Sequence, residues 1–105
     1  MKAELILEQP DTAVVSGCVD FATVPDLWEQ IAAWLKTRTS ATLSLRSVTQ
    51  ANSAALALLL EAIEFARQSS VILYLTDIPE SVLTLARLSN IDTLLLSEYQ
   101  RTPHD

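Results

Sequence analysis

Glycine is almost missing from this chain: among its 105 residues, Gly17 is the only one. Phosphate-binding loops of the nucleoside-triphosphate and dinucleotide types need several glycines within a short span, because their backbone must approach the phosphates closely. The sequence therefore argues against an ATPase and against a dinucleotide-dependent enzyme, and we expect no cofactor.

Cysteine and histidine are equally scarce, with one of each at Cys18 and His104. A lone cysteine cannot form an intramolecular disulfide, and a free cysteine is most often a small buried hydrophobe. His104 is expected to be a solvated surface residue. The chain offers no base near the thiol and no second cysteine or histidine, so we expect no catalytic residue, no metal site and no enzymatic activity.

Basic residues are few as well: seven Lys and Arg stand against thirteen Asp and Glu, giving a net charge of −6. The basic side chains are scattered, so neither a nucleic acid nor an anionic membrane surface is an expected partner. The longest apolar run, from Ala54 to Leu60, is far shorter than a membrane span. With no pattern of a signal peptide at its start, the chain is expected in the cytoplasm.

The chain does contain an alternation of strand and helix patterns. The expected strands cover residues 3–8, 12–17, 41–46, 71–75 and 92–96. Helical spacing and proline in a first turn predict a helix over 24–36. A second helix follows Asn52, and a third lies between Asp77, a plausible cap, and Asn90, which can end it in a left-handed turn.

This order, β-β-α-β-α-β-α-β, predicts an α/β fold with a mostly parallel central sheet that opens with a hairpin. We expect one domain over residues 1–97 and a flexible tail over 98–105. The run 71–75 is apolar without alternation, which is typical of a strand covered on both faces.

The second helix carries leucines on nearly every side. Placed at about 100° per residue from Ser53, one group of side chains should face water and another the sheet. The water-facing group is Ser53, Glu61, Glu64, Arg67 and Gln68, and the sheet-facing group is Ala55, Leu58, Leu59, Ala62, Phe65 and Ala66. Leu60 lies in the polar arc with Ala57 beside it and Leu56 on its border.

The three residues Leu56, Ala57 and Leu60 therefore predict an apolar strip that runs up the helix from Ser53 with a polar rim. Such a strip is typical of a surface that binds another protein. Two ordinary explanations stand beside this one: single exposed leucines are common, and the tail or a loop could cover them.

The start of this helix offers two candidate caps. Asn52 and Ser53 can each accept a backbone hydrogen bond there. If Asn52 is the cap, the Ser53 hydroxyl is free. A phosphate on it would be favoured by the helix N-terminus but would add about two negative charges beside the strip.

Residues 52–56, Asn-Ser-Ala-Ala-Leu, within this order of elements, resemble the STAS domain family. That family includes antagonists of anti-sigma factors and modules of sulfate transporters. Its usual signature is Asp, then Ser or Thr, then small residues and leucines, and in many regulators the hydroxyl is phosphorylated. Three stretches are similar to the MlaB group of that family: SGCVDFATVPDLWEQ (16–30), ALALLLEAIEFAR (55–67) and VLTLARLSNID (82–92).

The MlaB group comprises the small STAS subunits of the phospholipid ABC transporter that maintains outer-membrane asymmetry in Gram-negative bacteria. The resemblance implies a non-catalytic cytoplasmic protein that binds the transporter's ATPase subunit and reaches the inner membrane only through that complex. It implies a contact around the start of the second helix, at Asn52, Ser53, Leu56, Ala57 and Leu60. It also implies that Asp20 lies near the acceptor hydroxyl.

The helix start departs from the family pattern at two points. Asn52 stands where the family has Asp, which removes a charge that can assist phosphoryl transfer. Ala54 and Ala55 stand at glycine-like positions and stiffen the helix start. Both changes favour permanent docking over a phosphorylation switch. The alternatives are an anti-sigma factor antagonist regulated by phosphorylation of Ser53 and, third, a small-molecule binding domain.

Overall fold

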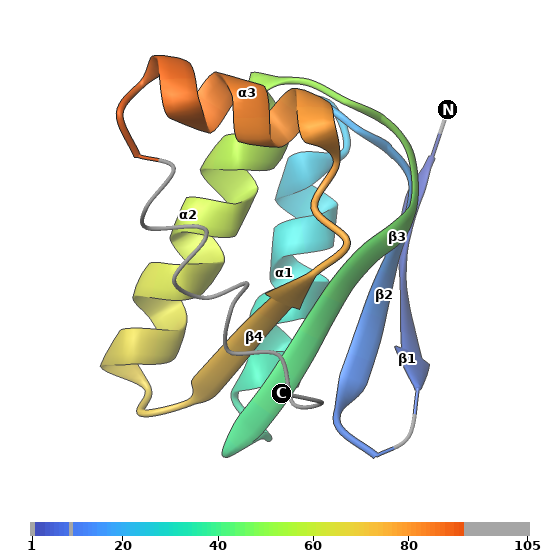
Figure 1. The fold of residues 1–105 in the computed structure, drawn as a ribbon. Helices are drawn as coiled ribbons and strands as arrows, with labels where there is room; N and C mark the ends of the chain where they lie inside the picture. Colours follow the sequence, from blue (N-terminus) through green and yellow to red (C-terminus); the bar gives the residue numbers. More distant parts are fainter. Residues whose placement is uncertain (1, 9, 92–105) are drawn as a thin grey trace.

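The computed structural model describes residues 2–8 and 10–91 (Figure 1). Its elements, in chain order, are β1 (Ala3–Glu8), β2 (Thr12–Val19), α1 (Val24–Leu35), β3 (Ser40–Ala51), α2 (Ser53–Gln68), β4 (Ile72–Thr76) and α3 (Glu80–Leu88). The expected strand over 92–96 and the expected tail over 98–105 lie outside the described residues.

The strands form one sheet in the order β1-β2-β3-β4. β1 runs antiparallel to β2, whereas β2 with β3 and β3 with β4 are parallel. The predicted α/β fold, with its hairpin followed by a parallel sheet, is confirmed. Since the two inner strands are parallel, their carboxyl ends meet at one edge of the sheet, the edge from which α1 and α2 depart.

Three strands differ from the prediction. β3 continues to Ala51 rather than ending at Arg46, because β2 also continues and pairs with it as far as Val19 opposite Ala51. β4 is not covered on both faces as predicted: Ile72 is 46% exposed, while Leu73 and Leu75 are buried. Although the sequence of β4 is an unbroken apolar run, the burial of its side chains alternates along the strand.

The ends of α3 give one correction and one confirmation. Asp77 is not the cap, because α3 starts only after Pro79 and Asp77 has a left-handed backbone with φ of 57°. Its carboxylate instead accepts a hydrogen bond from the buried Ser44 hydroxyl (3.1 Å). Asn90 does end the helix in a left-handed turn with φ of 59°, and the N–H of Ile91 donates to the carbonyl of Ala86 (2.9 Å).

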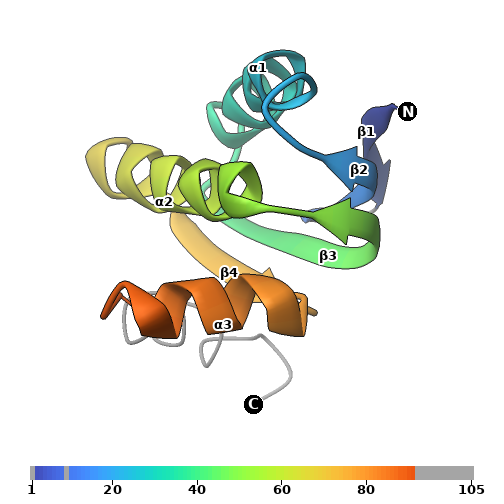
Figure 2. The ribbon, with the colours of Figure 1, turned by 90° about the horizontal axis from the view of Figure 1, so that it is seen from above.

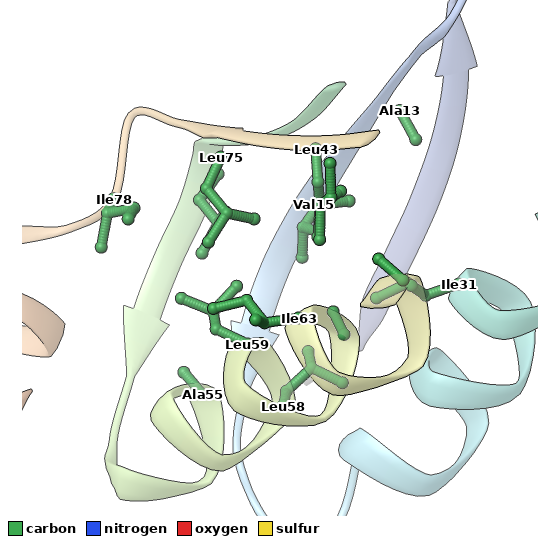
Figure 3. Close-up of a cluster of buried hydrophobic side chains, with 14 of the residues drawn as sticks. Ala13, Val15, Ile31, Leu43, Ala55, Leu58, Leu59, Ile63, Leu75 and Ile78 are labelled. Atoms are coloured by element: carbon green, nitrogen blue, oxygen red, sulfur yellow. The ribbon is translucent and has the colours of Figure 1, made fainter. Parts of the chain in front are cut away.

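The core lies between the sheet and α2. In Figure 3, Val15, Leu43 and Leu75 of the strands meet Leu59 and Ile63 of α2. Figure 2 shows α1 and α3 on opposite sides of α2, and both helices contact it. α2 is therefore covered on its sheet side and on both flanks, which explains why it carries leucines around most of its circumference.

The α1 flank of α2 is marked by an aromatic pair. The rings of Trp28 and Phe65 meet edge to face, with centroids 5.7 Å apart and planes at 84°. This arrangement places the positive edge of one ring on the negative face of the other, which adds to the area that the two side chains bury. The pair therefore contributes to the packing of α1 on α2.

The only glycine stands where β2 is distorted. Gly17 has φ of +97°, and the pairing of β2 with β3 shifts register on both sides of residues 16 and 17. A Cβ at this position would lie 2.1 Å from the carbonyl oxygen of Lys2. That carbonyl accepts the N–H of Cys18 (3.1 Å). The bulge reorients the last residues of β2, Cys18 and Val19, ahead of Asp20.

We expect Gly17→Ala to lower the free energy of unfolding by about 3 kcal/mol. The substitution would force alanine into a backbone conformation with positive φ, and its Cβ would clash with the backbone of Lys2. Ser70→Gly is the matched substitution of opposite sign. Ser70 is the second residue after α2 and has φ of 59°, so glycine there should raise stability by about 0.5 to 1 kcal/mol. Urea unfolding of the three proteins measures both effects, and an unchanged Gly17→Ala protein would contradict the steric explanation.

Candidate functional site

An open hollow of about 460 Å³ lies at the carboxyl ends of β2 and β3. It is lined by Cys18, Val19, Asp20, Thr49, Gln50, Ala51, Asn52 and Ser81. These residues come from the end of β2, the end of β3 with the cap of α2, and the first turn of α3. In an α/β sheet, this edge is where the chain most often builds a binding site.

Asp20 holds the turn between β2 and α1. Its Oδ1 accepts hydrogen bonds from the N–H groups of Ala22 (2.9 Å) and Thr23 (3.0 Å). Its Oδ2 accepts the thiol of Cys18 (3.4 Å). The backbone bond from Thr23, followed by the thiol bond, lowers the pKa of Asp20 below its ordinary value of 3.8. The carboxylate is therefore ionised at neutral pH and occupied by these donors.

Cys18 is buried, as the sequence predicted, with 7% of its surface exposed. It also has polar partners, because its thiol faces the carboxylate of Asp20 and the side-chain carbonyl of Gln50 (3.5 Å). Burial, then the bond to Asp20 and its negative charge, raise the pKa of Cys18 above 9.0. The thiol therefore stays protonated near neutral pH, which disfavours its use as a nucleophile.

Asn52 is the cap of α2, so the hydroxyl of Ser53 is not needed for capping. The Asn52 side chain accepts the N–H of Ala54 (2.8 Å) from an extended backbone at φ of −130°. Ser53 is exposed as the first residue of the helix. Within residues 2–8 and 10–91 no group hydrogen-bonds its hydroxyl. A hydroxyl thus stands at the helix N-terminus, directly after a residue that lines the hollow.

The predicted exposure of the apolar strip is wrong for Leu56. Leu56 is only 8% exposed and belongs to the core cluster, and Leu60 is partly buried against that cluster. Leu56 lies half a turn around α2 from Phe65, hence on the flank away from α1, and α3 packs on α2 there. Of the three residues, only Ala57 is exposed. The water-facing residues of α2 are otherwise as predicted.

Sequence reasoning missed the most exposed apolar side chain at this edge. Phe21 directly follows Asp20 and is 71% exposed. The available signal was an aromatic residue between a strand end and a helix start, outside the periodicity of either element. Thr49 and Gln50 were missed because the expected strand ended at residue 46, and Ser81 because only the tertiary fold brings α3 to this edge.

The described helices do not include one with both the length and the apolar character needed to cross a membrane.

Solved structures with this fold include two anti-sigma factor antagonists. SpoIIAA in its unphosphorylated form superposes with a TM-score of 0.65 and 15% identity, covering 87% of this chain and 83% of that one. An anti-sigma factor antagonist from Mycobacterium paratuberculosis has a TM-score of 0.72 and 20% identity, covering 88% and 81%. At these identities the likeness shows the fold. No curated protein compared with the chain matches it significantly.

The fold and the capped, hydroxyl-bearing start of α2 thus define a STAS-type domain. The family model described as "Mlab, STAS domain" matches residues 6–97, and the chain belongs to this MlaB-type STAS family.

The position of Leu56 can be tested by truncation. We expect Leu56→Ala to lower the free energy of unfolding by about 2 to 4 kcal/mol, because it leaves a cavity between α2 and its neighbours. Ala57→Ser, one residue away on the exposed face, should change stability by less than about 0.5 kcal/mol. Chemical denaturation provides both values, and near-equal effects of the two variants would place Leu56 on the surface again.

The Asp20 carboxylate should contribute to acid stability. Because its pKa is lowered in the folded protein, its contribution is complete above the unfolded pKa and is lost as the pH falls through the folded one. Between about pH 5 and pH 2 the wild type should therefore lose more stability than Asp20→Asn, which cannot ionise. Urea unfolding over this range gives the two profiles, and parallel profiles would show that Asp20 contributes nothing.

Proposed function

We propose that this protein is a non-catalytic subunit that docks on the ATPase of a phospholipid ABC transporter and supports the assembly and activity of the complex. Membership in the MlaB-type family supports this role. The observation that carries it is the exposure of Ser53 and Ala57 in the first turns of α2 and of Phe21 after β2, in the two strand-to-helix connections whose Asp20 and Asn52 line the hollow. The protein would act in the cytoplasm, at the inner membrane through its partner.

The docking surface, here Phe21, Ser53 and Ala57, combines features that suit a protein partner. Phe21 offers a large aromatic side chain with most of its area exposed, and such residues often carry much of the binding energy. Ala57 leaves the helix surface flat beside the Ser53 hydroxyl. Glu61 and Glu64 are exposed further along α2 and would form a polar rim.

A second function is favoured by one observation: Asn52 caps α2, so the exposed Ser53 does not use its hydroxyl as the helix cap. It is therefore accessible to a kinase, as an anti-sigma factor antagonist regulated at Ser53 would require. Against this function, Asn52 is an amide where the family has a carboxylate, so of Asn52 and Asp20 only Asp20 carries a carboxylate. That carboxylate already accepts three hydrogen bonds. We rank permanent docking first.

The docking surface is tested by binding to the phospholipid-transporter ATPase of the same organism. Phe21→Ala and Ala57→Glu should each weaken binding at least about tenfold, because one removes an aromatic anchor and the other places a charge in the interface. Gln68→Glu adds the same charge at the exposed far end of α2 and should bind like the wild type. Ala57 is chosen over Leu60, whose partial burial would confound binding with folding.

Calorimetric titration gives the affinities, and thermal unfolding checks that each variant is folded. Wild-type affinity of both Phe21→Ala and Ala57→Glu would reject the surface, and no binding by the wild type would reject the partner. Incubation with a serine kinase from the same organism distinguishes the second function, since phosphorylation of Ser53 followed by release of an anti-sigma factor would favour signalling.

A further inference from the structure

β1 presents an open edge at the opposite side of the sheet from β4. Among the described residues, β1 pairs with β2 alone. Ile6 is 47% exposed and Leu7 61% exposed, so both faces of this edge strand carry an uncovered apolar side chain. Natural edge strands are usually protected by lysines, proline, bulges or a covering element, because unpaired backbone groups invite another strand. The six residues of β1 include no lysine, no proline and no bulge, and their only charges are the exposed carboxylates of Glu4 and Glu8.

Beside this edge lies an apolar groove of about 400 Å³ between β1 and α1. It is lined by Leu5, Leu7, Gln30, Ala33, Trp34 and Thr37. No charged side chain lines it, although the chain as a whole has a net charge of −6. An acidic protein repels its own copies over most of its surface, so an uncharged region is where two copies can approach.

We propose that β1 pairs antiparallel with β1 of a second copy about a two-fold axis, so that the two sheets become one continuous sheet. The proposal is independent of the docking function, because it uses the lateral edge of the sheet rather than the carboxyl ends of β2 and β3. In Figure 2, β1 lies at the margin of the molecule, away from α3.

The charges on β1 select one register. Residues that face each other in an antiparallel pair point to the same side of the sheet, so a two-fold axis must pass through one residue and its own copy. With the axis at Leu5, Lys2 lies opposite Glu8 of the second copy, and this attraction occurs twice. Glu4 then lies opposite Ile6.

The neighbouring registers are disfavoured by like charges. With the axis at Ile6, Glu4 faces Glu8 of the second copy twice, and with the axis at Glu4, two copies of that carboxylate face each other. Like charges directly opposite destabilise a strand pair. Glu8 already pairs with Arg46 of its own chain (2.5 Å), so in the Leu5 register it would lie between two cations.

The same register also closes the groove. A two-fold axis perpendicular to the sheet keeps α1 of both copies on one face, where Leu5 and Leu7 line the groove. Leu5 then meets its own copy and Leu7 lies beside Ala3 of the second copy. The apolar side chains of the two grooves join into one layer, which covers an edge that no other described strand pairs with.

The test uses complementary charge variants and sedimentation velocity over a wide concentration series. The wild type should dimerise. Lys2→Glu and Glu8→Lys should each dimerise at least about tenfold more weakly, because each replaces two attractions by two repulsions. An equimolar mixture of the two variants should recover the dimer, since every pair across the interface then has opposite charges. Thermal unfolding checks that loss of the Arg46 pair leaves Glu8→Lys folded.

A cross-link identifies the register independently. In a Cys18→Ala background, Leu5→Cys should form a disulfide between copies under mild oxidation, because residue 5 faces itself at a distance that a disulfide spans. Leu7→Cys is the matched control and should cross-link far less. A monomeric wild type at all concentrations, a mixture that stays monomeric, or equal cross-linking of the two cysteine variants would each overturn the proposal. If β1 instead pairs only with a strand of a different protein, the purified wild type would stay monomeric, which is the first of these outcomes.

Discussion

The burial of α2 on three sides is the constraint on which the rest of this structure depends. The helix packs its leucines against the sheet, contacts α1 through the Trp28–Phe65 pair, and contacts α3 on its other flank. Because nearly all of its apolar surface is used inside the domain, only a narrow exposed face remains. Ser53 and Ala57 lie on that face at the N-terminal end. The same packing that stabilises the domain therefore decides how little of α2 is available to a partner.

The second determinant of the site is the bulge at Gly17. By shifting the register of β2 against β3, it places Cys18 and Asp20 at the hollow while β3 extends alongside to Ala51. Asp20 is then occupied by hydrogen bonds from Cys18, Ala22 and Thr23, and it organises the turn that exposes Phe21. Asp20 thus has a structural role that does not depend on phosphorylation.

Much of the fold followed from local patterns. The hairpin, the parallel strands, α1 with Pro25 in its first turn and the left-handed Asn90 all depend on residues close together in sequence, and they were predicted correctly. For the cap of α2 the sequence left two candidates, of which the structure uses Asn52. The errors lie where distant segments decide. The length of β3 depends on β2, Asp77 turns toward Ser44 instead of capping α3, and the exposure of Leu56 depends on the position of α3.

By itself, the sequence determined the fold class, the absence of a glycine-rich phosphate loop and the two candidates, Asn52 and Ser53, for the cap of α2. These properties come from composition, hydrophobic period and short-range hydrogen bonding, which a single strand or helix already contains. Only the tertiary structure decided which leucines of α2 reach the surface and that Phe21 stands exposed beside the hollow. A helical wheel assigns directions to side chains, but burial depends on the neighbouring elements that occupy those directions.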